Sequence, residues 1–236
     1  MNGALTENRY KILTFINRCG IVTLKQLSKV FTNVSRQTLH ATRKQLLELG
    51  YIEEITFSAE KLYLITTKGT KECNYYLKGL NFNSVILNHS LIVNEILIEQ
   101  ILKNDNSENF DFRTERDIKQ SYYVSGTFHK DILDKIPDFI IEKNERNFAY
   151  EIELSLKKMK RLHKKISDYF KLISNETYVQ VVYMCGNEEV KKHVTNAVNE
   201  VYTNKYNELN NSLSSTEDDL LTLELIKDSF IIKRMS

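Results

Sequence analysis

Residues 136–161, IPDFIIEKNERNFAYEIELSLKKMKR, are the most informative segment for the architecture of the second half of the chain. Its start predicts a short apolar strand, Phe139–Ile141, directly after Pro137-Asp138. A tight polar turn over 143–146 then leads into a second strand, Phe148–Leu154. Even positions of this second strand are apolar and odd positions are small or acidic, so we expect a half-buried strand in a mixed sheet.

The alternation has a chemical consequence, because it places two carboxylates on one strand face. Glu151 and Glu153 lie on that face, about 7 Å apart along the strand. If the two strands pair as a hairpin, Asp138 reaches the same face. Hard carboxylate oxygens suit Mg²⁺ or Mn²⁺, so the pattern predicts a divalent-cation site that acts on a phosphodiester. The plainer alternative is an amphipathic strand with a solvated acidic face.

The segment after the strand predicts a basic helix over 157–174. Lys157, four residues beyond Glu153, is placed to orient a water molecule or to stabilise charge on a phosphate. The basic residues of this segment are expected on the exposed faces of the helix, as a track for DNA phosphates. This track comprises Lys157, Lys158, Lys160, Arg161, Lys164 and Lys165.

The order Pro137-Asp138, turn, Glu151-x-Glu153-Leu154-Ser155-x-Lys157, with Arg161 and Tyr169 beyond, resembles the PD-(D/E)XK nuclease core. More narrowly, it is similar to the MobC-type plasmid relaxases and the related replication-relaxation proteins. The resemblance spans most of residues 1–185. It implies a winged helix followed by a restriction-endonuclease-like domain that nicks DNA with a divalent metal at a transfer or replication origin.

Residue roles follow from this resemblance. It gives Asp138 the Asp role, Glu151 or Glu153 the Glu role, and Lys157 the Lys role. Auxiliary residues are implied on an earlier helix, namely His89 and Asn94, with Glu95 or Glu99 as a further carboxylate. The nuclease motif has a lysine two residues after its Glu, where this chain has Glu153. Either Lys157 fills that role, or the site is degenerate and only binds DNA.

Upstream, the pattern predicts three helices and a β-hairpin within residues 1–80. The helices are expected at 7–19, 24–31 and 36–49, the strands at 51–57 and 61–66, and a further helix at 70–79. This order resembles winged helix-turn-helix domains, in which the third helix enters the major groove. The DNA contacts it implies are Arg36, Gln37, Thr38, His40, Arg43 and Lys44. Winged helices also serve as protein-interaction modules, which is the alternative.

The rest of the chain supplies scaffold for a second domain, 81–236. An almost wholly apolar helix is expected at 85–103, a short strand near 110–114, a buried strand at 178–184 and a helix at 187–203. A polar loop is expected over 204–219. Residues 220–226 and 230–232 predict terminal strands or an interaction tail.

Charge alternates in blocks along the 236-residue chain, although the net charge is only +2. Residues 1–80 carry 12 Lys/Arg against 6 Asp/Glu, and residues 157–171 carry 7 against 1. The intervening residues 81–156 carry 14 Asp/Glu against 8 Lys/Arg. Two basic blocks around an acidic one favour an anionic partner that is gripped at two places.

Composition excludes several classes of protein. Three distant cysteines without a CxxC argue against a disulfide framework and a zinc ribbon, and no apolar run reaches the length of a membrane span. P-loop, dinucleotide and GxSxG motifs are absent from the sequence, and its histidines are scattered. We therefore expect a cytoplasmic protein that binds double-stranded DNA at a plasmid origin and works beside other mobilisation or replication proteins. The alternatives are a non-catalytic origin-binding accessory protein and a transcriptional regulator whose second domain dimerises.

Overall fold

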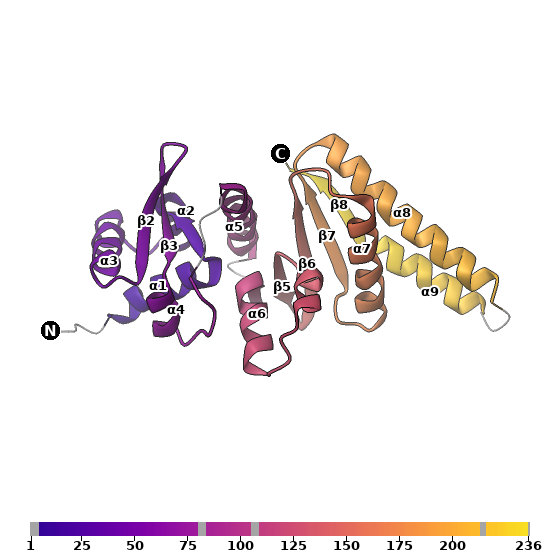
Figure 1. Cartoon of the computed structure of the whole chain (residues 1–236), viewed down its shortest axis with the longest axis horizontal. Helices are drawn as coiled ribbons and strands as arrows, with labels where there is room; N and C mark the ends of the chain where they lie inside the picture. The colour runs from indigo at the N-terminus through magenta and orange to yellow at the C-terminus, as the bar shows by residue number, and fades with distance from the viewer. Residues whose placement is uncertain (1–4, 80–83, 105–108, 213–215, 236) are drawn as a thin grey trace. The chain divides into compact units, whose positions relative to one another are not determined.

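The computed structural model describes residues 5–79, 84–104, 109–212 and 216–235 (Figure 1). Within these ranges the chain is a mixed α+β protein with nine α-helices, a three-stranded sheet and a five-stranded sheet. It divides into two compact units. Unit 1 comprises residues 1–107 and 113–128, and unit 2 comprises residues 108–112 and 129–236.

Unit 1 opens with the predicted helices and hairpin and with one further short strand, β1, that was not predicted. These are α1 (Glu7–Cys19), β1 (Ile21–Thr23), α2 (Leu24–Val30), α3 (Arg36–Glu48), β2 (Ile52–Phe57) and β3 (Glu60–Ile65). Strand β3 lies between β1 and β2 and runs antiparallel to both. Gly20 and Gly50 follow α1 and α3 with φ values of 78° and 68°, a conformation that glycine adopts without strain. The predicted helices and strands up to residue 66 are confirmed to within one residue at each end.

Three more helices complete unit 1: α4 (Thr67–Glu72), α5 (Ser84–Asn104) and α6 (Glu115–Val124). The expected helix at 70–79 is wrong in its bounds. Thr66 starts α4 earlier, because its hydroxyl accepts a hydrogen bond from the Gly69 N–H at 3.0 Å. Asn74 has a φ of 58° and follows the end of the helix.

Helix α5 packs within unit 1, although we expected it in the second domain. Leu87 joins the buried side chains of Ile21, Leu62 and Leu64, and the Asn94 amide donates to the Ile21 carbonyl at 2.6 Å. The boundary expected between residues 80 and 81 falls outside the described residues. By length and composition alone α5 is apolar enough to cross a membrane, which is weak evidence for a span, and Leu87, Ile96, Leu97 and Ile98 on it are buried.

The five-stranded sheet of unit 2 has the order β4-β5-β6-β7-β8. Its strands are β4 (Phe110–Thr114), β5 (Phe139–Lys143), β6 (Arg146–Glu153), β7 (Gln180–Cys185) and β8 (Phe230–Arg234). β5 and β6 form the predicted antiparallel hairpin, with a turn confined to Asn144 and Glu145, both at positive φ. β7 runs parallel to β6, and β8 runs parallel to β7.

Three α-helices, α7 (Met159–Ser174), α8 (Glu188–Asn210) and α9 (Glu217–Asp228), pack beside this sheet, and a short 3-10 helix, η1 (Lys130–Lys135), precedes β5 (Figure 1). The predictions for the C-terminal region were partly wrong. α8 continues through residues expected as loop, and 220–226 is helical rather than extended. A capping box between Thr216 and Asp219 starts α9, and Leu223 and Ile226, three residues apart, are buried on one side of it. The terminal strand at 230–232 is confirmed as part of β8.

Candidate functional site: a buried carboxylate cluster and two basic surfaces

The β5–β6 hairpin fixes Asp138 at the start of β5. Its backbone N–H donates to the Tyr150 carbonyl at 3.0 Å, and its Oδ2 accepts from the Ile152 N–H at 2.7 Å. The side chain is therefore held against β6 between the positions of the two glutamates. The hairpin that the sequence predicted is what brings the three carboxylates to neighbouring strands.

Glu151 and Glu153 lie on the same face of β6, as predicted, but that face is buried. Their relative exposures are 1% and 2%. Glu151 accepts hydrogen bonds from the Lys165 ammonium at 2.7 Å and from the Tyr169 hydroxyl, both on α7. Glu153 pairs with the Lys157 ammonium at 2.5 Å. The alternative of a solvated acidic face is thus excluded for these two residues.

Burial is the main influence on the ionisation of Glu153. It raises the pKa of this carboxyl above its ordinary value, and the positive charge of Lys157 opposes the rise only in part. The negative charge of Glu151 adds to the rise. At Glu153, therefore, the cost of burial outweighs the stabilisation that Lys157 provides.

Lys165 is the cation at the centre of the cluster. Its Nζ contacts Glu151, lies 3.5 Å from the Ile136 carbonyl, and interacts electrostatically with Asp138 and Glu153. Burial works against its charge, yet the neighbouring carboxylates prevail and raise the pKa of Lys165. We expected Lys165 on an exposed phosphate track. This expectation was wrong, because the residue lies on the side of α7 that also buries Leu162, Ile166 and Tyr169.

Tyr183 on β7 completes the cluster and was missed from the sequence, where it appeared as one residue of a buried strand. It stands opposite Glu151 in the parallel β6–β7 register and is fully buried. Burial, followed by the charges of the three carboxylates, raises its pKa far above the ordinary value. Within the described part of the chain its hydroxyl has no hydrogen-bond partner. A buried hydroxyl without a partner is costly, and in a polar site it indicates a place for a further ligand or water.

The side chains of the cluster are chemically suited to a divalent cation. Carboxylate oxygens are the ligands that Mg²⁺ and Mn²⁺ prefer, and Tyr183 stands opposite Glu151 in the β6–β7 register. In the described residues, however, no three acidic, histidine or cysteine side chains are arranged as a ligand set. The reason is visible in the contacts: Lys165 and Tyr169 hold Glu151, and Lys157 holds Glu153. The carboxylate oxygens suit a divalent cation, but in this structure lysine side chains pair with Glu151 and Glu153.

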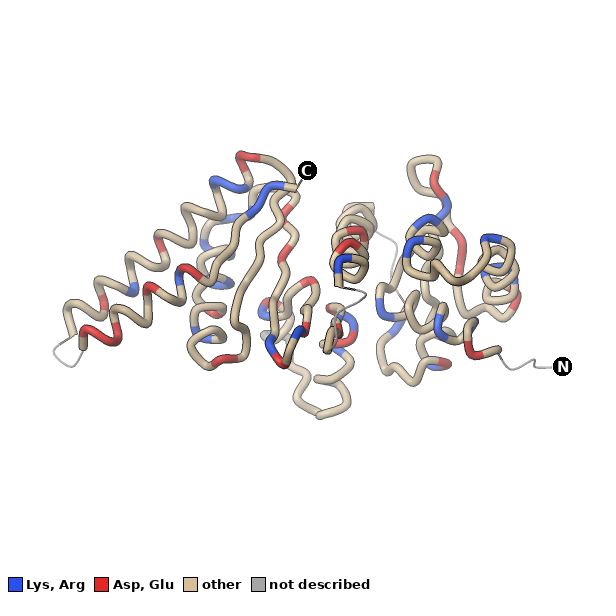
Figure 2. Tube along the Cα trace, turned by 180° about the vertical axis from the view of Figure 1, so that it is seen from behind, with Lys and Arg blue, Asp and Glu red and all other residues tan. Residues whose placement is uncertain are grey.

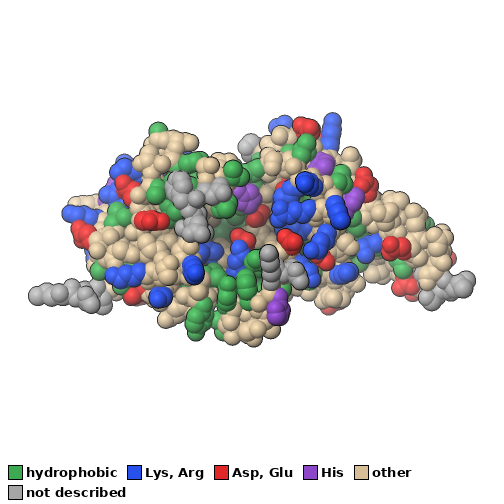
Figure 3. All heavy atoms as spheres, viewed as in Figure 1, with side chains coloured by type: hydrophobic (Ala, Val, Ile, Leu, Met, Phe, Trp, Pro, Cys, Tyr) green, Lys and Arg blue, Asp and Glu red, His purple; other side chains and the backbone are tan. Residues whose placement is uncertain are grey.

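The exposed side of α7 keeps most of the predicted basic track (Figure 3). Lys158, Arg161 and Lys164 are exposed, and the last two lie 3.7 and 3.6 Å from Asp134. Such exposed ion pairs contribute little to stability and are readily exchanged for phosphate contacts. Helix α9 has the opposite character, because acidic positions recur along it (Figure 2).

Helix α3 presents a second basic surface. Ser35 caps it by accepting from the Thr38 N–H at 3.1 Å, and Arg36, Gln37 and Thr38 are exposed on its first turn. His40 is half-buried. Lys44 is exposed, 3.9 Å from Glu48.

Arg43, which we predicted as a DNA contact, is engaged within unit 1. It turns back onto β3 and β2, where it donates to the Tyr63 hydroxyl at 3.2 Å and lies 3.6 Å from Glu54. In this conformation Arg43 links α3 to the hairpin.

The auxiliary residues on α5 are engaged inside unit 1. Asn94 holds β1, and Glu95 pairs with Lys29 and lies 3.5 Å from the Gln26 amide on α2. His89 is half-buried on the same helix, and Glu99 forms a surface pair with Lys103 at 3.8 Å. The contacts of Asn94 and Glu95 therefore give these two residues a structural role in joining α5 to α2 and β1.

Comparison with known proteins yields no relative: no family model, no curated protein and no solved structure matches the chain. The MobC-type resemblance accordingly remains one of motif and element order.

Proposed function

We propose that this protein binds double-stranded DNA and nicks it in a reaction that depends on Mg²⁺ or Mn²⁺. The observation that carries the proposal is the pair of buried carboxylates, Glu151 and Glu153, on one face of β6. Asp138 is hydrogen-bonded to the Ile152 N–H between them, and the Lys165 ammonium contacts Glu151. Glu151 and Glu153 are almost fully buried, and desolvation of a carboxylate charge is costly. Strongly perturbed ionisable groups that gather in this way are typical of functional sites.

The order of elements supports the same reading. In unit 2, a strand, a hairpin bearing Asp138 and Glu151, a helix and a parallel strand follow one another, as in the PD-(D/E)XK core that the sequence resembles. In unit 1, the order α1-β1-α2-α3-β2-β3 and the exposed start of α3 support a winged helix that reads DNA. By the same resemblance, we propose a cytoplasmic protein of plasmid mobilisation or replication that acts at an origin.

In this mechanism Asp138, Glu151 and Glu153 would hold the cation, which polarises the phosphodiester and makes the attacking water more acidic when bound. The chain's own groups do the rest. Lys158, Arg161 and Lys164 bind flanking phosphates, and Lys157 or Lys165 stabilises the negative charge that develops on the attacked phosphate. Water supplies the incoming oxygen, one phosphorus–oxygen ester bond breaks, and the departing oxygen takes up a proton.

A second candidate function is DNA binding without cleavage. Its specific support is that both glutamates are paired with side chains. Glu151 pairs with Lys165 and Tyr169 of α7, and Glu153 pairs with Lys157, just before that helix. In that case the protein is an accessory factor or regulator, and the carboxylate cluster has no catalytic role.

Nicking of supercoiled plasmid that carries the native origin tests the proposal. Wild type with Mn²⁺ is expected to give open-circle product, whereas Asp138→Asn and Glu151→Gln should lose cleavage by at least about 10²-fold and retain DNA binding. Glu145→Gln, on the exposed turn of the same hairpin, is the matched control and should cleave like wild type. Bound but uncut DNA with every protein would favour the second candidate.

A further inference from the structure

Lys165 occupies the position in the carboxylate cluster where a cation is needed. Its Nζ lies 2.7 Å from both oxygens of Glu151, so neither oxygen is left without a positive neighbour. The same ammonium interacts with Asp138 and Glu153, the other two carboxylates of the site. Its side chain is only 17% exposed. Lys165 therefore acts as an internal counter-cation.

A divalent ion and this ammonium cannot share the site as it stands. An Mg²⁺ ion binds a carboxylate oxygen at about 2.0–2.1 Å, so an ion on Glu151 would lie within a few ångströms of Nζ. Like charges at that separation repel strongly in a buried environment. One of the two cations has to leave before the other binds Glu151.

We propose that Lys165 competes with the divalent cation for Glu151 and gives up this carboxylate when DNA arrives, so that metal loading is coupled to DNA binding. This inference rests on the proposed function and adds its regulation. A phosphate of the bound strand offers the released ammonium a new anionic partner. Without DNA the site stays filled by the chain's own lysine, which keeps the nuclease from loading metal in the absence of its substrate.

The other lysines of the region lack these features. Lys157 contacts one oxygen of Glu153 and its side chain is 30% exposed. Lys164, next to Lys165 in the sequence, is 58% exposed and faces Asp134. Among these three, Lys165 is the least exposed, and it contacts both oxygens of Glu151.

Binding of Mn²⁺ to the full-length protein without DNA, measured by titration calorimetry, tests the inference without any activity assay. Lys165→Met is expected to bind Mn²⁺ about tenfold more tightly than wild type, because the competing charge is gone. Lys165→Gln, which keeps a hydrogen-bond donor but no charge, guards against a folding defect and should behave in the same way. Lys171→Met, on the exposed side of α7, is the matched control and should equal wild type.

The same titration in the presence of an uncleavable origin duplex completes the test. DNA should tighten Mn²⁺ binding to wild type and have much less effect on Lys165→Met. Equal Mn²⁺ affinities of wild type and both Lys165 variants would overturn the competition while leaving the proposed function intact. Absence of Mn²⁺ binding from every protein, with and without DNA, would count against the metal-dependent function itself and overturn the inference with it.

Discussion

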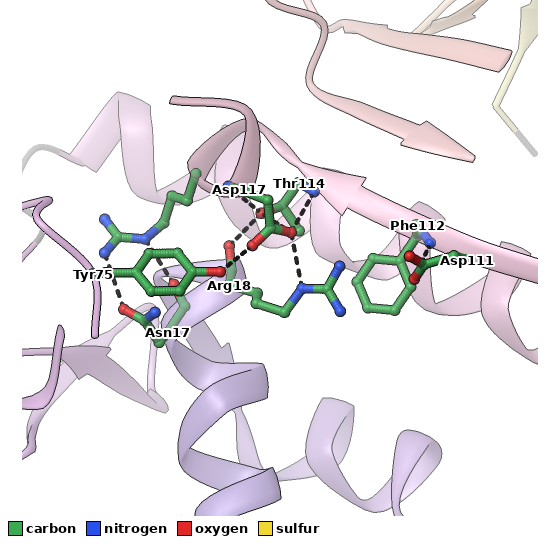
Figure 4. A network of polar contacts seen from close by, with 8 residues as sticks. Asn17, Arg18, Tyr75, Asp111, Phe112, Thr114 and Asp117 are labelled. Carbon is green, nitrogen blue, oxygen red and sulfur yellow. Dashed lines mark hydrogen bonds and ion pairs between the residues drawn. The ribbon is translucent and has the colours of Figure 1, made fainter. Parts of the chain in front are cut away.

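The two units each bury a polar cluster, and the two clusters are built on different principles. In unit 1, Asp117 at the start of α6 is held by Arg18 at 2.8 Å and by Tyr75 at 2.5 Å (Figure 4). Thr114 caps α6 and also donates to the Arg18 carbonyl at 2.7 Å. One carboxylate here receives a matched set of donors.

The cluster of unit 2 holds its glutamates more deeply. Glu151 and Glu153 are 1% and 2% exposed, burial raises the pKa of Glu153, and the hydroxyl of Tyr183 has no partner among the described residues. An unused donor does not distinguish the two networks, because the Asn17 amide nitrogen in unit 1 also has no partner among the described residues. The difference lies in the carboxylates: Asp117 is held by charged and polar donors, whereas burial raises the pKa of Glu153, a perturbation that is typical of functional sites.

The largest expected effect is on the matched cluster. Arg116 on α6 is 9% exposed, and it donates to the Asn17 carbonyl at 2.7 Å and the Asn17 Oδ1 at 3.3 Å. Arg116→Met should lower the free energy of unfolding by about 3 kcal/mol, because it leaves these acceptors buried without a donor. Urea denaturation measures the loss. Lys11→Met, which removes an exposed pair with Glu7, is the control and should cost under about 0.5 kcal/mol. A loss as small as that control would show that the cluster does not hold α6.

How far the sequence predicts the fold depends on whether the signal is local. Periodicity, caps and glycines predicted the helices and strands of residues 7–66 and the hairpin around Asn144 and Glu145, because those signals lie within a few residues. The packing of α5 could not be predicted, since an apolar helix fits either core. α9 was not predicted although its signal is local. Its leucines suggested a strand or an interaction tail, whereas the capping box of Thr216 and Asp219 begins a helix.

The candidate site shows the same division between local sequence signals and contacts from distant parts of the chain. Alternation along β6 paired Glu151 with Glu153, and the short hairpin added Asp138. The partners on α7 and β7 come from distant positions in the chain, so Lys165 was assigned to the exposed side and Tyr183 to scaffold. One signal was present for Lys165, which lies with Leu162, Ile166 and Tyr169 on the apolar stripe of its helix.

A pair of tyrosine variants sharpens the comparison through the sign of the effect. Tyr75→Phe removes the hydrogen bond to Asp117 and should lower the free energy of unfolding by about 1 kcal/mol. Tyr183→Phe removes a buried hydroxyl without a partner and should leave stability unchanged or raise it by up to about 1 kcal/mol. Parallel urea titrations without divalent metal measure both. Equal losses for the two variants would erase the distinction between the clusters.

The smallest expected effect is the pH dependence of stability that Glu153 contributes. Because its pKa is raised in the folded protein, the unfolded carboxyl ionises first as the pH rises past its ordinary value of 4.5. The folded protein therefore loses stability from that point up to the folded pKa, and the loss then stays constant. Glu153→Gln removes this term, so its stability relative to wild type should increase with pH across that window, by under about 1 kcal/mol because Lys157 offsets part of the penalty. Urea titrations between about pH 4 and pH 8 measure the difference, and Glu145→Gln should show no such trend. A difference that falls with pH would mean that Lys157 stabilises the Glu153 carboxylate by more than burial costs it, and the unit 2 cluster would then be as well matched as that of unit 1.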